Sequence, residues 1–315
     1  MPNYSTFSGV INPELESLAE TQEASRWREN EINLTEDYGD FMKLKPNERR
    51  MFANTLSFLA IADGLINKNL LTRFIEEVAD PSARRFYLFQ TVMEDVHART
   101  YGLMLQAVVP DRDERERLLK PHENSEAINA KIKWIEKWIE GDYPFYQRLL
   151  AFAIAESILF SPSFVPFYWA KKRGILHGLS LANDFIAKDE GLHCVFALTL
   201  NKYLGERCTD EVIHQMMREA VEVENVYIDE TLPEGIEELS NAMLKDYIKA
   251  IADAWLPQFI NNYGKPCAIL FKKENPIHWI DRINIRPVSE FFERRDGNYT
   301  NISNDQMKVE FDTDF

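Results

Sequence analysis

Residues 149–164, LLAFAIAESILFSPSF, place a single glutamate in the middle of an otherwise apolar segment. Ala, Ile and Phe surround Glu156 on every face of the helix that this pattern predicts. A buried carboxylate without a partner is costly, so it is usually neutralised, paired or bound to a metal. The segment therefore predicts a core helix in which Glu156 has a partner elsewhere in the chain.

Helical periodicity recurs along most of the sequence. Apolar residues return at spacings of three and four over residues 46–77, 82–109, 131–140, 144–173, 180–204, 210–226 and 236–256. The apolar fraction of 45% in 315 residues is sufficient for a large core. We therefore expect an all-α fold, one large helical bundle with additional helices, over residues 26–290. The polar residues 1–25 predict an extended arm, and residues 291–315 predict a flexible C-terminal tail.

Composition argues against several classes of function. The net charge of −15 disfavours binding to nucleic acid or to an anionic membrane. No apolar run approaches the roughly 20 residues of a membrane span, and the start MPNYSTFSGV lacks the features of a signal peptide. Cys194, Cys208 and Cys267 lack metal-ligand spacing and fit free thiols in a reducing compartment. We expect a cytoplasmic protein without a nucleotide-binding loop.

Other apolar helical segments also contain isolated acidic and imidazole side chains. These are Asp63, Glu94, His97, Glu190 and His193. A Glu-x-x-His spacing places both side chains on one helical face, with Cβ atoms about 5–6 Å apart. Two such pairs, with one carboxylate from each of two further helices, form the ligand set of a carboxylate-bridged dimetal centre. Four carboxylates and two neutral imidazoles balance two divalent ions, so we expect Glu156 to bind metal.

A Glu-x-x-His pair alone is weak evidence. The chain contains a third pair, Glu211 and His214, in a segment that is polar on most faces, and we expect that pair at the surface without a ligand role. A lone buried acid such as Asp63 is also compatible with a protonated or salt-bridged core residue. The prediction rests on the coincidence of all six side chains in apolar helices.

A buried dimetal centre can store iron, activate oxygen for substrate oxidation or generate a radical. Tyr101 lies four residues after His97 and shares its helical face, about 10 Å along the axis from Glu94. A tyrosine there, shielded by Phe160 and Phe164, is a candidate for oxidation. An ordinary core tyrosine with a hydrogen-bonded hydroxyl is the alternative interpretation.

The sequence resembles a known family in several segments. They are EASRWRENEINL (23–34), the helix around Asp63, MEDVHARTY (93–101), AESILFSPSF (155–164), KKRGILHGLSLANDFIAKDEGLHC (171–194) and FFERRDGNY (291–299). The chain is similar, from about residue 24 onward, to the small, radical-generating subunit of class I ribonucleotide reductase. The resemblance implies a ferritin-like helical fold, a homodimer and a larger catalytic subunit that reduces the nucleotides.

The resemblance also implies roles for individual residues. It makes metal ligands of Asp63, Glu94, His97, Glu156, Glu190 and His193. Tyr101 matches the radical tyrosine. Trp27, Asp189 and His97 match a hydrogen-bonded chain that leads from the metal towards the surface. Tyr299 matches a tail tyrosine that relays the radical, and the ending VEFDTDF (309–315) is similar to the acidic tail that docks on the large subunit.

The implied function is the small subunit of ribonucleoside-diphosphate reductase, an oxidoreductase of deoxyribonucleotide synthesis. The chain has no plausible redox-active cysteine pair and no evident nucleotide site, so it would make a one-electron oxidant and deliver it to a partner. A ferritin-like diiron oxygenase or oxidase is the alternative, but it would not need Trp27, Asp189, Tyr299 or the docking tail. An iron-storage ferritin is typically shorter.

The ligand types suit iron and manganese equally. Lys68 stands where many relatives have a glutamate, and a lysine there resembles a manganese-using branch activated by superoxide, in which the tyrosine is not oxidised. This favours two manganese ions slightly. The alternatives are a diiron centre with a tyrosyl radical, activated by oxygen, and a surface lysine without a role.

Overall fold

The helices predicted from periodicity are present, and several begin at recognisable start signals. Pro46 and Pro81 occupy the first turns of two long helices, where a missing backbone N–H is tolerated. The Asp80 carboxylate caps the second of these by accepting hydrogen bonds from the N–H groups of Ser82 and Ala83. The computed structural model describes residues 12–120, 125–260 and 269–280, all within one compact unit.

The long helices are α1 (Pro13–Ala24), α3 (Pro46–Asn69), α5 (Pro81–Val108), α8 (Glu126–Ile135), α9 (Phe145–Ile154), α10 (Ser161–Arg173), α11 (His177–Tyr203), α12 (Asp210–Thr231) and α13 (Asn241–Ile260). Shorter elements are η1 (Glu29–Glu31), α2 (Asp37–Lys43), α4 (Ile75–Glu77) and α6 (Arg112–Leu118). Three π-helical turns, η2 (Leu70–Phe74), η3 (Glu136–Glu140) and η4 (Ala155–Leu159), follow α3, α8 and α9.

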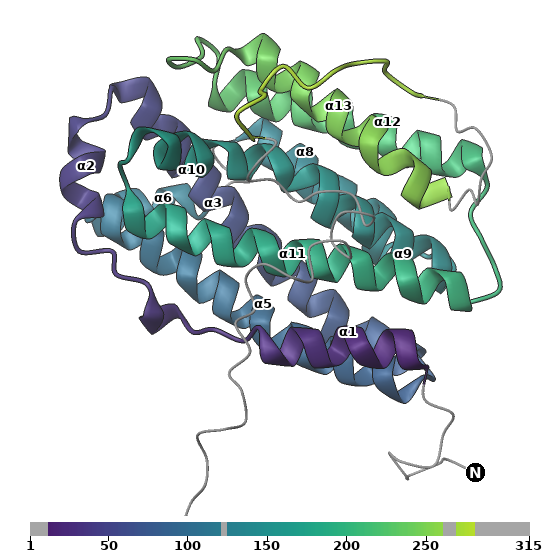
Figure 1. Cartoon of the computed structure of the whole chain (residues 1–315). Coiled ribbons are helices and arrows are strands. Elements are labelled where there is room, and N and C mark those ends of the chain that lie inside the picture. The colour runs from purple at the N-terminus through teal and green to yellow at the C-terminus, as the bar shows by residue number, and fades with distance from the viewer. Residues whose placement is uncertain (1–11, 121–124, 261–268, 281–315) are drawn as a thin grey trace, which may run out of the picture. The chain divides into compact units, whose positions relative to one another are not determined.

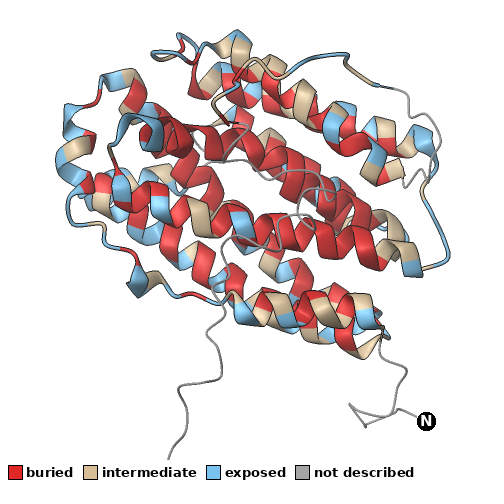
Figure 2. Ribbon diagram, in the orientation of Figure 1, coloured by how far each residue is buried: buried red, intermediate tan, exposed pale blue. Residues whose placement is uncertain are grey.

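The core is a bundle built from α3, α5, α11 and the continuous segment α9–η4–α10. Helix α5 packs against α3 and α11, and α11 packs against α9, η4 and α10 (Figure 1). Helix α12 packs against both α8 and α13, and α12 and α13 contact η4. Figure 2 shows that α9, η4 and the first part of α10 are buried on nearly every face, as the apolar run around Glu156 predicts.

The stretch Phe145–Arg173 is long and apolar enough to cross a membrane, but its most apolar window is entirely buried in the protein. Core helices of globular proteins have this property. The stretch is interrupted at η4, where the N–H of Phe160 bonds to the carbonyl of Ala155, five residues back. Pro162 lacks the N–H that a continuous α-helix would need at this point, which favours the interruption.

The N-terminal region differs from the predicted extended arm. Residues 13–24 form α1, whose Leu15, Leu18 and Ala19 are buried, and the helix packs against α5 and α11. Arg85 of α5 also binds the Glu23 carboxylate at 2.6 Å. Three apolar positions among polar neighbours were too few to indicate a helix, and the neighbouring helices supply the missing stabilisation.

The start of α11 is fixed by a very close contact with the chain around α2. A Cβ atom at Gly178 would lie 2.4 Å from the carbonyl oxygen of Asn33 and 2.4 Å from Oδ2 of Asp37. The same Asp37 carboxylate accepts a hydrogen bond from the N–H of Leu179 at 3.1 Å. Only glycine leaves room for this approach, which sets the position of the helix that contains Glu190 and His193.

Within the described residues, one ion pair outside the region around Glu156 is completely buried. Lys131 of α8 and Glu224 of α12 are each 0% exposed, with 2.8 Å between Nζ and Oε1. The ammonium also lies 3.7 Å and 3.8 Å from the ring centroids of Phe58 and Tyr227. Burial lowers the pKa of Lys131 to about 8 and raises the pKa of Glu224 to about 7.

Candidate metal centre

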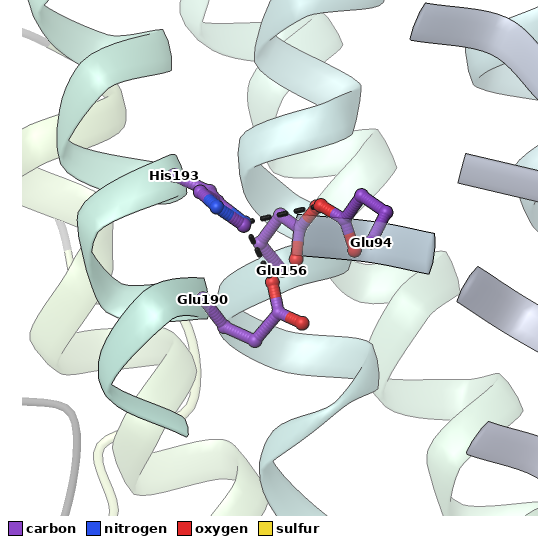
Figure 3. Close-up of side chains that lie close together, drawn as sticks. All are labelled: Glu94, Glu156, Glu190 and His193. Atoms are coloured by element: carbon purple, nitrogen blue, oxygen red, sulfur yellow. Dashed lines mark hydrogen bonds and ion pairs between the residues drawn. The ribbon is translucent and has the colours of Figure 1, made fainter. Parts of the chain in front are cut away.

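The six side chains singled out in apolar helices meet in the middle of the bundle. Each is at most 1% exposed. They come from four segments: Asp63 from α3, Glu94 and His97 from α5, Glu156 from η4, and Glu190 and His193 from α11. Figure 3 shows four of them, from α5, η4 and α11, pointing towards one another. The sequence prediction that these residues lie together is confirmed.

Potential ligand atoms form two groups that share one residue. One atom each from Glu94, Glu156, Glu190 and His193 lie within 4.8 Å of one another, as do atoms from Asp63, Glu94 and His97. Glu94 belongs to both groups. This is the arrangement expected of two neighbouring cation positions joined by a carboxylate.

Two glutamates each reach both imidazoles. Nδ1 of His97 is 3.4 Å from Oε2 of Glu94 and 3.2 Å from Oε1 of Glu190. Nδ1 of His193 is 3.1 Å from Oε1 of Glu94 and 3.0 Å from Oε2 of Glu190. The two oxygens of each carboxylate therefore face different histidines, which suits a bridging role for both glutamates.

The remaining carboxylates lack protein donors. Neither oxygen of Asp63 has a hydrogen-bond partner in the described part of the chain, and the Glu156 carboxylate faces that of Glu190 rather than a donor. Burial, together with the charge of neighbouring carboxylates, raises the pKa of Asp63 and of Glu156 well above the usual values. Buried oxygens without donors fit a site for divalent cations.

The pKa values of the two imidazoles are also raised, but for a different reason. Burial alone would lower their pKa values, but the adjacent carboxylates outweigh it. Contacts with Asp189 and Glu190 raise the pKa of His97 well above its usual value, and Glu94 and Glu190 raise the pKa of His193 to about 9. These shifts follow from the close approach of four carboxylates and two imidazoles in a buried site.

A hydrogen-bonded chain leads away from the cluster. The indole Nε1 of Trp27 donates to Oδ2 of Asp189 at 2.8 Å, and the same oxygen lies 3.0 Å from Nε2 of His97. The Trp27 ring also stacks on the His97 ring, with centroids 5.8 Å apart and an interplanar angle of 18°. Trp27, Asp189 and His97 are in contact, as the sequence resemblance implied.

Gln90 is part of the site and was missed at the sequence level. It is fully buried on α5, and its Nε2 donates to Oε1 of Glu94 at 2.9 Å. The available signal was a polar residue four positions before Glu94 in an apolar helix. A glutamine is a poor metal ligand, so the pattern of acids and histidines does not include it.

Tyr101 is buried, with 1% of its surface exposed, and its hydroxyl has no hydrogen-bond partner in the described residues. Burial raises its pKa well above the usual value, and the nearby charge of Asp63 adds to this. Ring contacts in the described chain join Phe160 to Phe58 and Phe164 but do not include Tyr101. Tyr101 is therefore buried, and its shielding by Phe160 and Phe164 stays a prediction.

Two predicted site residues are not placed at the cluster. The Lys68 side chain is 60% exposed, and its Nζ lies 3.0 Å from Oε1 of Glu140. It follows Asp63 by five residues, which turns it about 140° away around the helix. The side chain lies in a surface ion pair, and its functional role stays a prediction. Tyr299 and the tail 291–315 lie outside the described residues. Of the third Glu-x-x-His pair, predicted at the surface, Glu211 is exposed and His214 is half-buried.

Fold and cluster together define a ferritin-like helical protein with a paired carboxylate–imidazole site. The family model described as ribonucleotide reductase, small chain, matches residues 7–263. This chain therefore belongs to the ribonucleotide reductase small-chain family.

Individual relatives agree with the family model. The ribonucleoside-diphosphate reductase small chain of Nicotiana tabacum is 35% identical over 291 residues, which cover 92% of this chain and 87% of the relative. The small subunit from Dictyostelium discoideum is 38% identical over 277 residues, which cover 88% and 80% of the two chains.

Solved structures agree on the fold. The ribonucleotide reductase Rnr4 homodimer of Saccharomyces cerevisiae superimposes with a TM-score of 0.77 at 29% identity, covering 88% of this chain and 87% of the other. The dimanganese(II)-NrdF of Streptococcus sanguinis has a TM-score of 0.76 and covers 90% and 97% of the two chains. Its identity of 16% makes it a match in fold alone.

Proposed function

We propose that this protein is the small subunit of a ribonucleoside-diphosphate reductase. Its buried centre generates the one-electron oxidant that a large subunit uses to reduce ribonucleotides to deoxyribonucleotides. The observation that carries the proposal is the cluster itself, in which Glu94 and Glu190 each reach both histidines in the core of a chain of this family. A diiron oxygenase shares such ligands, but the family membership does not favour it.

Asp63, Glu94, His97, Glu156, Glu190 and His193 would hold two divalent ions. The donor-free oxygens of Asp63 support this assignment, because a cation would compensate their burial. When bound, the metal pair supplies a one-electron oxidant after reaction with oxygen or superoxide. The chain excludes water from the site, because each ligand is at most 1% exposed.

Iron and manganese both suit this set of carboxylates and imidazoles. The slight preference for manganese rests on sequence resemblance at Lys68, and the pairing of that side chain with Glu140 at the surface adds no support. Elemental analysis with electron paramagnetic resonance on protein from its native host decides between the metals. Manganese with no tyrosyl signal would make Tyr101 a bystander, whereas iron with a tyrosyl signal would make Tyr101 the radical site.

Trp27, Asp189 and His97 would form the route by which the oxidant leaves the centre. Asp189 accepts from the indole N–H and holds Nε2 of His97 through the same oxygen, which leaves Nδ1 of the imidazole facing the cluster. With 5% of its surface exposed, Trp27 lies at the outer end of this chain. Tyr299 in the tail would continue the relay to the large subunit.

Docking on the large subunit would use the C-terminal segment VEFDTDF. Deletion of residues 309–315 should abolish ribonucleotide reduction in the presence of the large subunit from the same organism, while metal content stays at the wild-type level. A synthetic VEFDTDF peptide should inhibit the intact protein, and a scrambled peptide should not. Full activity after the deletion would refute this partner assignment.

A homodimer is part of the proposal. The Rnr4 protein of Saccharomyces cerevisiae, which shares this fold, was solved as a homodimer. Leu88 and Val92 of α5, one turn apart, are 52% and 44% exposed and offer apolar surface for a second copy. Sedimentation equilibrium should give twice the chain mass of 36.8 kDa. A monomer at micromolar concentration would contradict it.

A further inference from the structure

Gln90 makes a buried hydrogen bond to a residue of the cluster. The side chain is 0% exposed, and it has one hydrogen bond, from Nε2 to Oε1 of Glu94. Its own Oε1 has no partner within the described residues. A buried acceptor without a donor is destabilising, and leucine or methionine would fill a similar volume without that penalty.

The oxygen that Gln90 binds belongs to the carboxylate that lies between the two histidines. Oε1 of Glu94 lies 3.1 Å from Nδ1 of His193, whereas Oε2 of the same carboxylate lies 3.4 Å from Nδ1 of His97. A rotation of the carboxylate would withdraw both oxygens from their histidines at once. The amide N–H restrains that rotation through a charge-assisted hydrogen bond in a water-free interior.

The charge of the side chain at this position also matters. The cluster already contains four carboxylates, so an acidic side chain at position 90 would add a fifth negative charge. A basic side chain there would compete with the metal ions for the carboxylates. A neutral donor is the remaining way to hold Glu94 without altering the charge balance. Gln90 and Glu94 are four residues apart on α5, so the helix itself keeps the amide and the carboxylate in register.

We propose that Gln90 is a positioning residue that holds Glu94 in the orientation joining the two halves of the metal centre. This inference rests on the proposed dimetal function. The proposal has a specific consequence. Without the amide, one ion can still bind to Glu156, Glu190 and His193, a group that keeps three ligands. The second ion depends on Glu94 as a shared ligand, so its affinity should fall.

The test is an anaerobic titration of the metal-free full-length protein with Mn(II), in which free ion is counted from its paramagnetic resonance signal. The variants are Gln90→Met and Gln90→Leu. We expect the affinity for one of the two ions to fall by about 10- to 100-fold, which is typical when a group that orients a ligand is lost. The signal of magnetically coupled manganese should decrease in parallel, with far-UV circular dichroism unchanged.

Gln22→Leu is the matched control. Gln22 is another buried glutamine, 2% exposed on α1, and neither of its amide atoms has a partner in the described part of the chain. This variant should bind two ions with wild-type affinity, which separates the role of Gln90 from the general effect of removing a buried amide.

The outcomes separate this inference from the proposed function. If the wild-type protein binds no pair of ions, the dimetal site itself is wrong. If the wild-type protein binds two ions and both Gln90 variants bind them equally well, only the positioning role is refuted. Loss of both ions together with loss of helical content would show that Gln90 is a structural residue and would also refute the positioning role.

Discussion

Removal of one member of the buried Lys131–Glu224 pair should destabilise the protein strongly, and removal of both should not. At 2.8 Å and an effective dielectric constant of about 20, the pair attraction is about 6 kcal/mol, much of it offset by desolvation. Breaking a buried pair typically costs about 3–5 kcal/mol, because the remaining charge has no partner. Both side chains are 0% exposed, so solvent offers no compensation.

The assay is urea unfolding of Lys131→Met, Glu224→Leu and the double variant, followed by far-UV circular dichroism. Each single variant should lose about 3–5 kcal/mol, and the double variant should lie within about 1 kcal/mol of wild type or above it. Their non-additivity measures the interaction. Single variants within about 1 kcal/mol of wild type, or a double variant with the summed loss, would refute the reasoning.

The penalty for Lys131→Met should also depend on pH. Burial raises the pKa of Glu224 to about 7 even with Lys131 opposite, and removal of the ammonium raises it further. Above pH 7 the folded variant must then retain a proton that the unfolded chain has lost. A raised carboxyl pKa contributes stability that is lost as pH rises, so the penalty should grow from pH 7 to pH 8. A penalty independent of pH would contradict this.

Three further perturbations test other parts of the structure. Asp189→Asn should keep two metal ions per chain by elemental analysis but lower reductase activity about 10- to 100-fold, because it weakens the contact that orients His97. Unchanged activity would exclude Asp189 from the proposed route of the oxidant. Gly178→Ala should lower the free energy of unfolding by about 1–3 kcal/mol, because its Cβ would meet two oxygens at 2.4 Å. Gly39→Ala, with nothing within 4 Å, should raise it by about 0.5–1 kcal/mol; equal effects of the two changes would be inconsistent with the close contact. The third test is alkylation of the native protein at pH 8, followed by peptide mapping. Cys194 should stay unmodified, because burial raises its pKa far above the usual range. Cys208 should be modified slowly, because burial raises its pKa to about 11. Rapid modification of both would contradict the burial.

The long helices of the core followed from apolar periodicity, and the six clustered residues followed from the rule that isolated charges in apolar helices need a partner. Glu156 is the clearest example, since every neighbour in its segment is apolar. The π-helical turn that contains it was not predictable from periodicity. A π-helical turn has one residue more than an α-helical turn, and where it forms depends on which donors the backbone carbonyls find. The carbonyl of Ala153, for example, accepts hydrogen bonds from the side chains of Ser157 and Cys194.

Other features depend on tertiary contacts that a linear pattern does not contain. Helix α1 has three buried apolar residues and is stabilised by α5 and α11. In the sequence, nothing about Gln90 distinguishes it from a glutamine on the exposed face of a helix. Resemblance at one position also does not indicate where a side chain points, and Lys68 binds Glu140 at the surface.

Helix α1 has a consequence for how the protein is trimmed or tagged. Trp27 follows the end of α1 by three residues, and Arg99 holds the next turn, η1, by its contact with Glu29 at 3.0 Å. A protein shortened to begin at residue 26 would retain every clustered carboxylate and imidazole. It would lose the helix that leads into Trp27 and packs against α5 and α11. We therefore expect normal metal content together with a weaker contact between the indole and Asp189.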